Sequence, residues 1–97
     1  MADISFEWDE RKNAENRRKH GVSFVEAQSV FLDEQSVQFF DEPHSSSEER
    51  FLMLGMSSHF RLLLVAHTFR EPDSVIRIIP ARRATGREGG HYPGRKP

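Results

Sequence analysis

Hydrophobic and polar positions divide the chain into a helical first third and a strand-rich remainder. A polar segment over 10–20 follows Asp9, a good helix N-cap, and stops at a glycine. Its acidic residues come first and its basic residues last, as the helix dipole favours. The pattern predicts a helix whose only apolar residue is Ala14, so we expect it to dock chiefly through Phe6 and Trp8 at its start.

A second, shorter helix is predicted directly afterwards. Ser23 and Glu26 have the spacing of a capping box, in which each side chain bonds the other residue's backbone N–H. Apolar side chains then recur on one helical face, at Phe24, Ala27 and Phe31. We expect this helix to end near Leu32.

From residue 36 onwards the pattern is that of β-strands. Strands are predicted over 36–40, 50–56, 60–70 and 74–80, and the polar segment 41–49 reads as a loop. The last two connections are too short for parallel crossovers, so the strands form an antiparallel meander. The strand over 60–70 is apolar on both faces and should be central.

The turn near Pro72 and Asp73 determines which residues face each other across the last two strands. A turn of two or four residues pairs His67 with Ile78, whereas a turn of odd length puts His67 opposite Arg77. The sequence leaves both registers open.

The predicted fold class is α+β, with two N-terminal helices packed on a four-stranded antiparallel sheet and a short basic C-terminal segment. With 97 residues, the chain has room for one domain over 1–97, with a core over 6–92 and a disordered tail over 93–97. Thr85 and Glu88 again have capping-box spacing, but nearby glycines should limit any helix to about one turn.

Composition excludes several classes of protein. No cysteine is present, which removes disulfides, thiolate metal sites and thiol nucleophiles. The five histidines lack metal-ligand spacing, and no serine-elbow or nucleotide-binding glycine motif occurs. The longest apolar run, 62–66, is too short to span a membrane, and the N-terminus lacks signal-peptide features. We expect a small soluble cytoplasmic domain without metal, cofactor or membrane association.

Charge is distributed unevenly along the chain. The net charge of −1 combines −6 over residues 1–50 with +5 over residues 51–97. Eleven of the fourteen basic residues are arginines, and eight of these lie between residues 50 and 95. Guanidinium groups bind phosphate through pairs of directed hydrogen bonds, so the second half favours an anionic partner.

These residues suit metal-independent cleavage of RNA. The reaction needs a base for the 2′-hydroxyl proton, cations for the phosphoryl charge and an acid for the 5′-oxygen. The candidate catalytic residues are His67, Arg77, Arg82, Glu88 and Tyr92. The candidate RNA-binding residues are Arg61, Arg70, Arg83 and Arg87.

Each candidate also has a purely structural interpretation. His67 lies in an apolar strand, where a histidine bonded to the backbone is common. Arg77 has possible ion-pair partners in Glu49 and Asp73. Likewise, Glu88 fits a helix cap, and Tyr92 fits a packed aromatic side chain.

Taken together, three separated motifs resemble the BrnT family of type II toxin–antitoxin toxins. The first is FEWDERKN over 6–13 with KHGVSF over 19–24. The others are VAHTFR over 65–70 and IRIIPAR over 76–82, the last continuing to Ala84, Thr85, Glu88 and Tyr92. By position, His67, Arg77 and Arg82 fall on the family's strand residues, and Glu88 and Tyr92 on its C-terminal segment.

The resemblance implies a RelE-like fold and a ribonuclease that arrests translation. It also implies neutralisation by a BrnA-type antitoxin with a ribbon–helix–helix part. The two proteins would form a heterotetramer that represses its own operon, so this chain would meet DNA only through the antitoxin.

Two departures from the family pattern keep a second function open. Pro80 stands where a small polar residue is usual, and glycines interrupt the closing segment around Glu88 and Tyr92. If those side chains are not held rigidly, the chain would be a catalytically inactive binding module that acts with its antitoxin on DNA.

Overall fold

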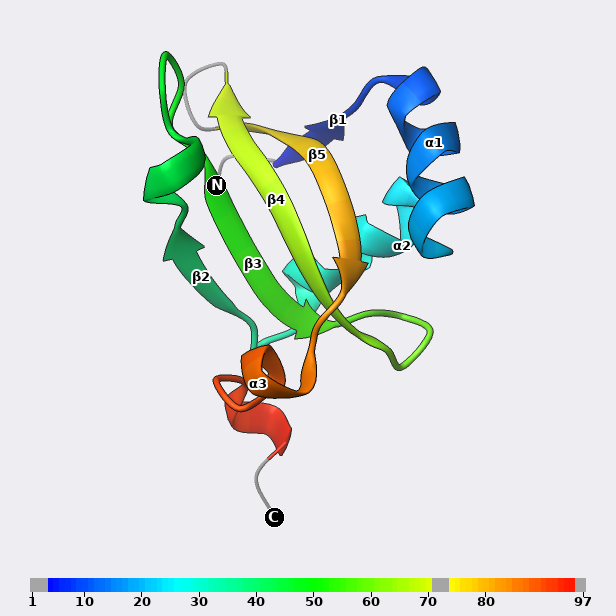
Figure 1. Cartoon of the computed structure of the whole chain (residues 1–97), viewed down its shortest axis with the longest axis vertical. Coiled ribbons are helices and arrows are strands. Elements are labelled where there is room, and N and C mark those ends of the chain that lie inside the picture. The colour runs from blue at the N-terminus through cyan, green and yellow to red at the C-terminus, as the bar shows by residue number, and fades with distance from the viewer. Residues whose placement is uncertain (1–3, 71–73, 96–97) are drawn as a thin grey trace.

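A computed structural model of the chain describes residues 4–70 and 74–95 (Figure 1). The helices are α1 (Glu10–His20), α2 (Phe24–Ser29) and α3 (Gly86–Gly89), with 3₁₀ turns at Val30–Leu32, Glu42–His44 and Pro93–Arg95. The strands are β1 (Ser5–Glu7), β2 (Val37–Phe40), β3 (Phe51–Met56), β4 (Leu62–Arg70) and β5 (Val75–Arg83). None of the described helices is long and apolar enough to span a membrane.

The prediction of a four-stranded antiparallel sheet was wrong in one respect. β2 to β5 form the expected antiparallel meander, but the sheet has five strands in the order β1-β5-β4-β3-β2, and β1 pairs with β5 in parallel. β1 has only three residues, too few for a recognisable alternation, and its partner lies some 70 residues later.

β4 starts two residues later than predicted. Phe60 lies in the turn before it with a φ of 60°, and its side chain is 88% exposed. A positive φ is rare for a non-glycine residue and is incompatible with a strand. β5 in turn runs to Arg83, three residues beyond its predicted end.

The pairing of β4 with β5 contains a bulge that reorients the end of β5. His67 lies opposite Ile78, as a turn of two or four residues requires, although residues 71–73 lie outside the described part of the chain. Val65 pairs with Ala81, so Ile79 and Pro80 together oppose the single residue between Val65 and His67. A proline fits this position because a bulge interrupts the ladder of hydrogen bonds.

The bulge also decides which face Arg82 occupies. In a regular strand Arg82 would share the face of Ile78, four residues earlier. Instead Ala81 joins the core beside Ile78, and Arg82 turns to the opposite face, the one that also carries Arg77. The two arginines therefore share one side of the sheet.

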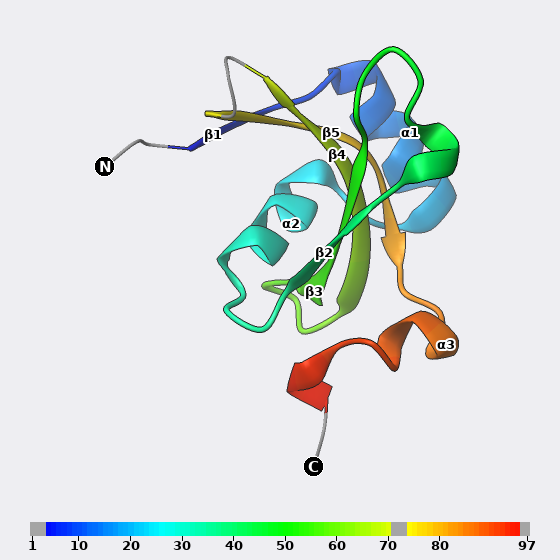
Figure 2. The same cartoon turned by 90° about the vertical axis from the view of Figure 1, so that its left-hand side faces the viewer.

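The core lies between α2 and one face of the sheet (Figure 2). It consists of Val22, Phe24, Ala27, Val30, Leu63, Val65, Ile78 and Ala81. A smaller cluster of Leu54, Leu64 and Tyr92 lies on the opposite face, where the C-terminal segment covers one end of the sheet. The rest of that face carries the loop after β2 and the groove described below.

α1 docks through two asparagines, a contact that the sequence did not predict. Nδ2 of Asn16 donates to the carbonyls of Val22 (2.8 Å) and Ala81 (2.7 Å), and its Oδ1 accepts from the Ala81 N–H (3.1 Å). Oδ1 of Asn13 accepts from the Phe24 N–H at 2.9 Å. Both asparagines are buried, so polar contacts fix a helix that has almost no apolar face.

Phe6 and Trp8 contribute to the docking as expected. Phe6 packs on Phe31 with ring centroids 5.2 Å apart, and Trp8 meets Phe24 edge-on at 6.0 Å. These contacts join the start of α1 to the core, while the asparagines hold its middle.

The C-terminal segment packs on one end of the sheet through Tyr92. Thr85 and Glu88 form the expected capping box, and α3 is a single turn. Residues 93–95 of the predicted disordered tail form a 3₁₀ turn, and residues 96 and 97 lie outside the described residues.

Replacing Asn16 should destabilise the whole domain. Asn16→Leu removes three hydrogen bonds and leaves two carbonyls and one N–H buried without partners, at a cost of about 2–4 kcal/mol. Urea unfolding followed by circular dichroism measures this loss. The exposed Arg11→Leu on the same helix should change stability by less than about 0.5 kcal/mol; equal midpoints for the two variants would contradict the anchoring role of Asn16.

Candidate active site

Arg82 and Glu88 form the centre of the candidate site. Arg82 is the penultimate residue of β5, and Glu88 lies on α3, six residues later. The guanidinium binds both carboxylate oxygens, with Nη1 2.9 Å from Oε1 and Nη2 2.8 Å from Oε2. The hydrogen bonds from Arg82 lower the pKa of Glu88 to about 2, so the pair is ionised at neutral pH.

Arg82 keeps donors for a further ligand. A guanidinium has five N–H groups. Two bind Glu88 and one binds the carbonyl of Arg83 at 3.2 Å. Within the described residues, its Nε–H and one Nη2–H are without acceptors, and its side chain is 40% exposed. An incoming phosphate can therefore bind Arg82 without displacing Glu88.

The pair lies in a groove of about 370 Å³ on the sheet face opposite α2. The groove is lined by His20, Asp41, His44, Arg50, Leu52, Leu64, Ala66, Pro80, Arg82 and Glu88. Apolar strand residues form its floor, and polar residues from α1, the loop after β2 and α3 form its rim. Its volume falls within the range of small-ligand sites, about 300–1,000 Å³.

Arg77 lies on the same sheet face as Arg82 but not in the groove. Their partners on β4 are Thr68 and Leu64, four residues apart, which is about 13 Å along a strand. Nη1 of Arg77 donates to Glu7 at 2.9 Å, an acid not considered from the sequence. Of the two acids that were considered, Asp73 lies outside the described residues.

Arg70 lies beside Arg77 at this end of the sheet. Its guanidinium is 3.6 Å from Glu7 and 3.5 Å from Glu48. Both arginines remain partly exposed on the open face, and the two glutamates balance their charge.

His67 is a core residue in this structure. Its exposure is 0%, and its ring packs against Phe31, Phe51 and Phe69. Nδ1 donates to the Val65 carbonyl at 3.1 Å, and Nε2 lies 3.0 Å from the Gln38 side-chain oxygen. Burial lowers the pKa of His67 and outweighs the hydrogen bond to Val65, so the ring is neutral and shielded from substrate.

Tyr92 anchors the C-terminal segment. Its ring is buried against Leu54 and Leu64, and its hydroxyl donates to Oδ2 of Asp33 at 2.5 Å. Burial and this hydrogen bond raise the pKa of Tyr92 to about 12. The structure therefore gives Tyr92 the packing role that was its alternative interpretation.

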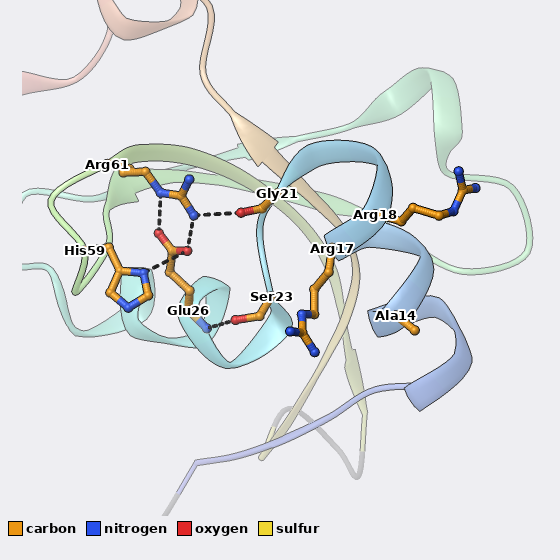
Figure 3. Close-up of a pocket in the computed structure, with 8 residues that line it drawn as sticks. All are labelled: Ala14, Arg17, Arg18, Gly21, Ser23, Glu26, His59 and Arg61. Carbon is orange, nitrogen blue, oxygen red and sulfur yellow. Dashed lines mark hydrogen bonds and ion pairs between the residues drawn. The ribbon is translucent and has the colours of Figure 1, made fainter.

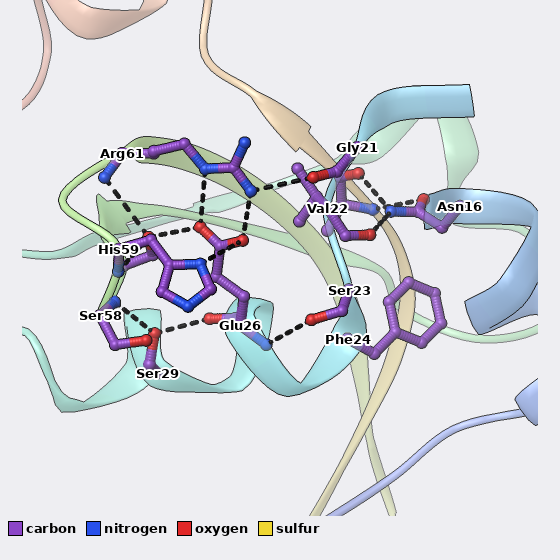
Figure 4. Close-up of polar contacts among 12 residues, drawn as sticks. Asn16, Gly21, Val22, Ser23, Phe24, Glu26, Ser29, Ser58, His59 and Arg61 are labelled. Carbon is purple, nitrogen blue, oxygen red and sulfur yellow. Dashed lines mark hydrogen bonds and ion pairs between the residues drawn. The ribbon is translucent and has the colours of Figure 1, made fainter. Parts of the chain in front are cut away.

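Arg61 belongs to a buried ion pair rather than to an open surface (Figures 3 and 4). It binds both carboxylate oxygens of Glu26, with Nε 2.9 Å from Oε2, and it also donates to the Gly21 carbonyl at 2.9 Å. Glu26 is 3% exposed and also contacts Ser57 and His59. Ser23 caps α2 as predicted, but the Glu26 carboxylate is used in these contacts, so the predicted capping box is only half formed. Burial alone would raise the pKa of Glu26, but the hydrogen bonds from Arg61 and Ser57 lower it to about 2.

This ion pair borders a wider hollow of about 740 Å³. Its lining residues are Ala14, Arg17, Arg18, Gly21, Ser23, Glu26, His59 and Arg61 (Figure 3). Arg18 pairs with Glu15, and three of the five N–H groups of Arg61 are bound by Glu26 and the Gly21 carbonyl. The hollow thus has fewer available donors than its arginine content suggests.

Arg83 and Arg87 are exposed at the end of the sheet near the groove, and within the described residues neither forms an ion pair. Among residues 4–70 and 74–95, no group of three potential metal ligands occurs.

The groove contains four polar residues that sequence reasoning did not select: His20, Asp41, His44 and Arg50. His44 follows Asp41 by three residues within a segment read only as a loop. That Asp-x-x-His spacing next to a proline is the one local signal that could have indicated a histidine held by a carboxylate.

The fold is that of a BrnT ribonuclease toxin. The crystal structure of the Brucella abortus ribonuclease toxin BrnT superimposes with a TM-score of 0.63 at 19% identity, over 84% of this chain and 97% of that one. Among curated proteins, none matches this chain.

The family model described as the ribonuclease toxin BrnT of type II toxin–antitoxin systems matches residues 8–88. The chain therefore belongs to the BrnT family, which confirms the resemblance seen in the three motifs. Membership of this family implies an antitoxin partner, because the toxin belongs to a type II system, and it implies endoribonuclease activity.

Removing the arginine of the buried pair should reduce stability. Arg61→Ala leaves the Glu26 carboxylate buried without its cation, which should cost about 3–5 kcal/mol. The exposed Arg83→Ala is the matched control and should cost less than about 0.5 kcal/mol. Adding Glu26→Gln to Arg61→Ala should recover part of the loss in denaturant unfolding. A fully stable Arg61→Ala would show that the pair is not structural.

Stability should fall in acid because of Glu26. Its pKa is about 2 in the folded chain against an ordinary value of 4.5, so the unfolded state binds the proton more readily. The stabilisation is complete above pH 4.5 and is lost as the pH falls towards 2. Thermal unfolding of Glu26→Gln across this window should show a shallower decline than that of the wild type; parallel curves would refute the assignment.

Proposed function

We propose that this protein is a metal-independent endoribonuclease whose reaction takes place in the groove around Arg82 and Glu88. The observation that carries the proposal is the placement of Arg82. The bulge turns it onto the open face, α3 holds it with two hydrogen bonds, and two of its donors remain available. Such a fixed cation can stabilise phosphoryl charge without reorganising during the reaction.

Charge stabilisation in this groove needs no metal ion. Arg50 lines the groove together with Arg82; its side chain is 26% exposed, and its Nε lies 3.6 Å from the Asp41 carboxylate. Two guanidinium groups can hold the non-bridging oxygens of one phosphodiester through directed hydrogen bonds. RNA supplies its own nucleophile in the 2′-hydroxyl, so the protein needs only proton transfer and charge stabilisation.

The arginines outside the groove are proposed to bind RNA away from the reacting phosphate. Arg77 and Arg70 share the open face with Arg82, and Arg83 and Arg87 are exposed beside it. Their replacement should weaken RNA binding in a salt-dependent way and affect the chemical step little. Arg61 is the least available of the proposed RNA-binding arginines, because Glu26 and the Gly21 carbonyl bind three of its five N–H groups.

The ordered closing segment favours an active enzyme over an inactive binding module. Despite its glycines, Glu88 is held by Arg82 and Thr85, and Tyr92 by Asp33. Pro80 lies in the bulge, where its missing N–H costs no ladder bond. Pro80 and the glycines of the closing segment are thus both compatible with a fixed Arg82 and Glu88, which supports the proposal of an active enzyme.

The proposed partner is a BrnA-type antitoxin with a ribbon–helix–helix part, forming a heterotetramer that binds DNA through the antitoxin alone. Family membership supports this proposal, as does an exposed apolar hollow lined mainly by Ile4, Phe6, Phe31, Leu32, Met53, Phe69 and Ile76. Contiguous apolar surface of this kind is typical of a protein interface. Cleavage of cellular RNA by the free toxin would then inhibit translation in the cytoplasm.

The test is cleavage of a purified structured RNA in EDTA. Arg82→Ala should reduce the rate by about 100–1,000-fold, the usual loss when one stabilising donor is removed. Arg11→Ala, at an exposed arginine on α1 that does not line the groove, should stay within about 3-fold of the wild type. Circular dichroism verifies the fold of each variant. Full activity of Arg82→Ala, or wild-type cleavage only with added metal, would contradict the proposal.

A further inference from the structure

Two histidines line the groove beside Arg82. His44 is the last residue of the 3₁₀ turn after β2, and His20 is the last residue of α1. The charged or titratable groups facing them in the groove are Asp41, Arg50, Arg82 and Glu88. Histidine is the side chain that most readily gains and loses a proton between pH 5 and 8. The groove thus combines two proton-transfer groups with two phosphate-binding cations.

A buried carboxylate orients His44. Nδ1 of His44 lies 3.1 and 3.0 Å from the two carboxylate oxygens of Asp41. A carboxylate can only accept, so Nδ1 carries the proton and Nε2 keeps its lone pair. The His44 side chain is 65% exposed, whereas that of Asp41 is 10% exposed. A histidine base held by a third group has this geometry.

The turn that carries the two residues is tied to the sheet. The Asp41 N–H donates to the Arg50 carbonyl at 2.8 Å. The Ser45 hydroxyl donates to the Asp41 carbonyl at 2.8 Å and accepts from the Arg50 N–H at 2.9 Å. Arg50 Nε lies 3.6 Å from the Asp41 carboxylate. These bonds fix Asp41 and His44 relative to β3. A flexible loop would not hold them in this way.

His20 enters the groove from a different element. It is the last residue of α1. It is exposed, so its ring can meet a substrate. The contacts of Asn16 hold α1, and hence the position of His20, against β5.

We propose that His44, positioned by Asp41, is the general base of the RNA cleavage reaction and that His20 is the general acid. This assignment rests on the proposed function of the groove. Nε2 of His44 removes the 2′-hydroxyl proton, and the 2′-oxygen forms a bond to phosphorus as the bond from phosphorus to the 5′-oxygen breaks. His20 gives its proton to the departing 5′-oxygen. The products are a 2′,3′-cyclic phosphate and a 5′-hydroxyl, and no metal or other reactant is consumed.

The experiment compares two RNA oligonucleotides of one sequence, in EDTA. One carries the natural 5′-oxygen at the cleaved bond, and the other carries sulfur there, which leaves without protonation. His44→Gln should lose at least about 100-fold in rate on both substrates. His20→Gln should lose a similar factor on the oxygen substrate and regain activity on the sulfur substrate. His91→Gln, an exposed histidine outside the groove, should match the wild type on both.

The positioning role of Asp41 has its own readout. Asp41→Asn exchanges one of the two oxygens that accept from His44 Nδ1 for an NH2 group, so kcat should fall while KM stays close to the wild-type value. Nitrogen NMR of the wild type should show the proton of neutral His44 on Nδ1. An unchanged kcat, or a proton found on Nε2, would overturn the role of Asp41.

The outcomes separate this assignment from the function on which it rests. If Arg82→Ala abolishes cleavage while His44→Gln and His20→Gln keep wild-type rates, the groove is the active site and the histidine assignment is wrong. If the wild type cleaves RNA neither free nor on ribosomes, the proposed function fails and the assignment fails with it. Identical behaviour of His20→Gln on both substrates would remove His20 as the acid.

Discussion

The side-chain amide of Asn16 takes the place of a strand at the open edge of β5. β1 pairs with β5 only at residues 75–77, so the N–H and carbonyl of Ala81 would face α1 without partners. Asn16 supplies one acceptor to that N–H and one donor to that carbonyl, as a neighbouring strand would. Buried backbone N–H and carbonyl groups need hydrogen-bond partners, so this contact fixes α1 although the helix has almost no apolar surface. It thereby also fixes His20, the groove residue at the end of α1.

The bulge in β5 is the second constraint, and it works together with the first. It places Ala81 towards the core, where its backbone can meet Asn16, and it turns Arg82 outward to the open face. Bulges near functional sites commonly redirect a side chain in this way. The one extra residue in β5 thus positions both Arg82, the proposed phosphate-binding cation, and the edge of β5 at Ala81 that α1 covers.

Two ion pairs with similar composition have different consequences because of their burial. Arg61 and Glu26 are enclosed between α2 and the loop before β4, so both charges are used in holding the fold. Arg82 and Glu88 lie at the rim of the groove, and the same bidentate contact there keeps an arginine fixed while part of it stays exposed. Desolvation makes the first pair costly to break, whereas exposure leaves the second able to accept a ligand.

Local patterns in the sequence by themselves determined the two N-terminal helices, their N-cap residues, the antiparallel meander and the family, because periodicity, capping and motif spacing involve residues close in the chain. They also selected Arg82 and Glu88, which lie only six residues apart. Tertiary structure alone decided the pairing of β1, the bulge that reorients Arg82, and the burial of His67 and Tyr92. It also brought His20 and His44 into one groove from segments 24 residues apart in the sequence. These features depend on contacts between distant segments and on burial, neither of which a local pattern contains.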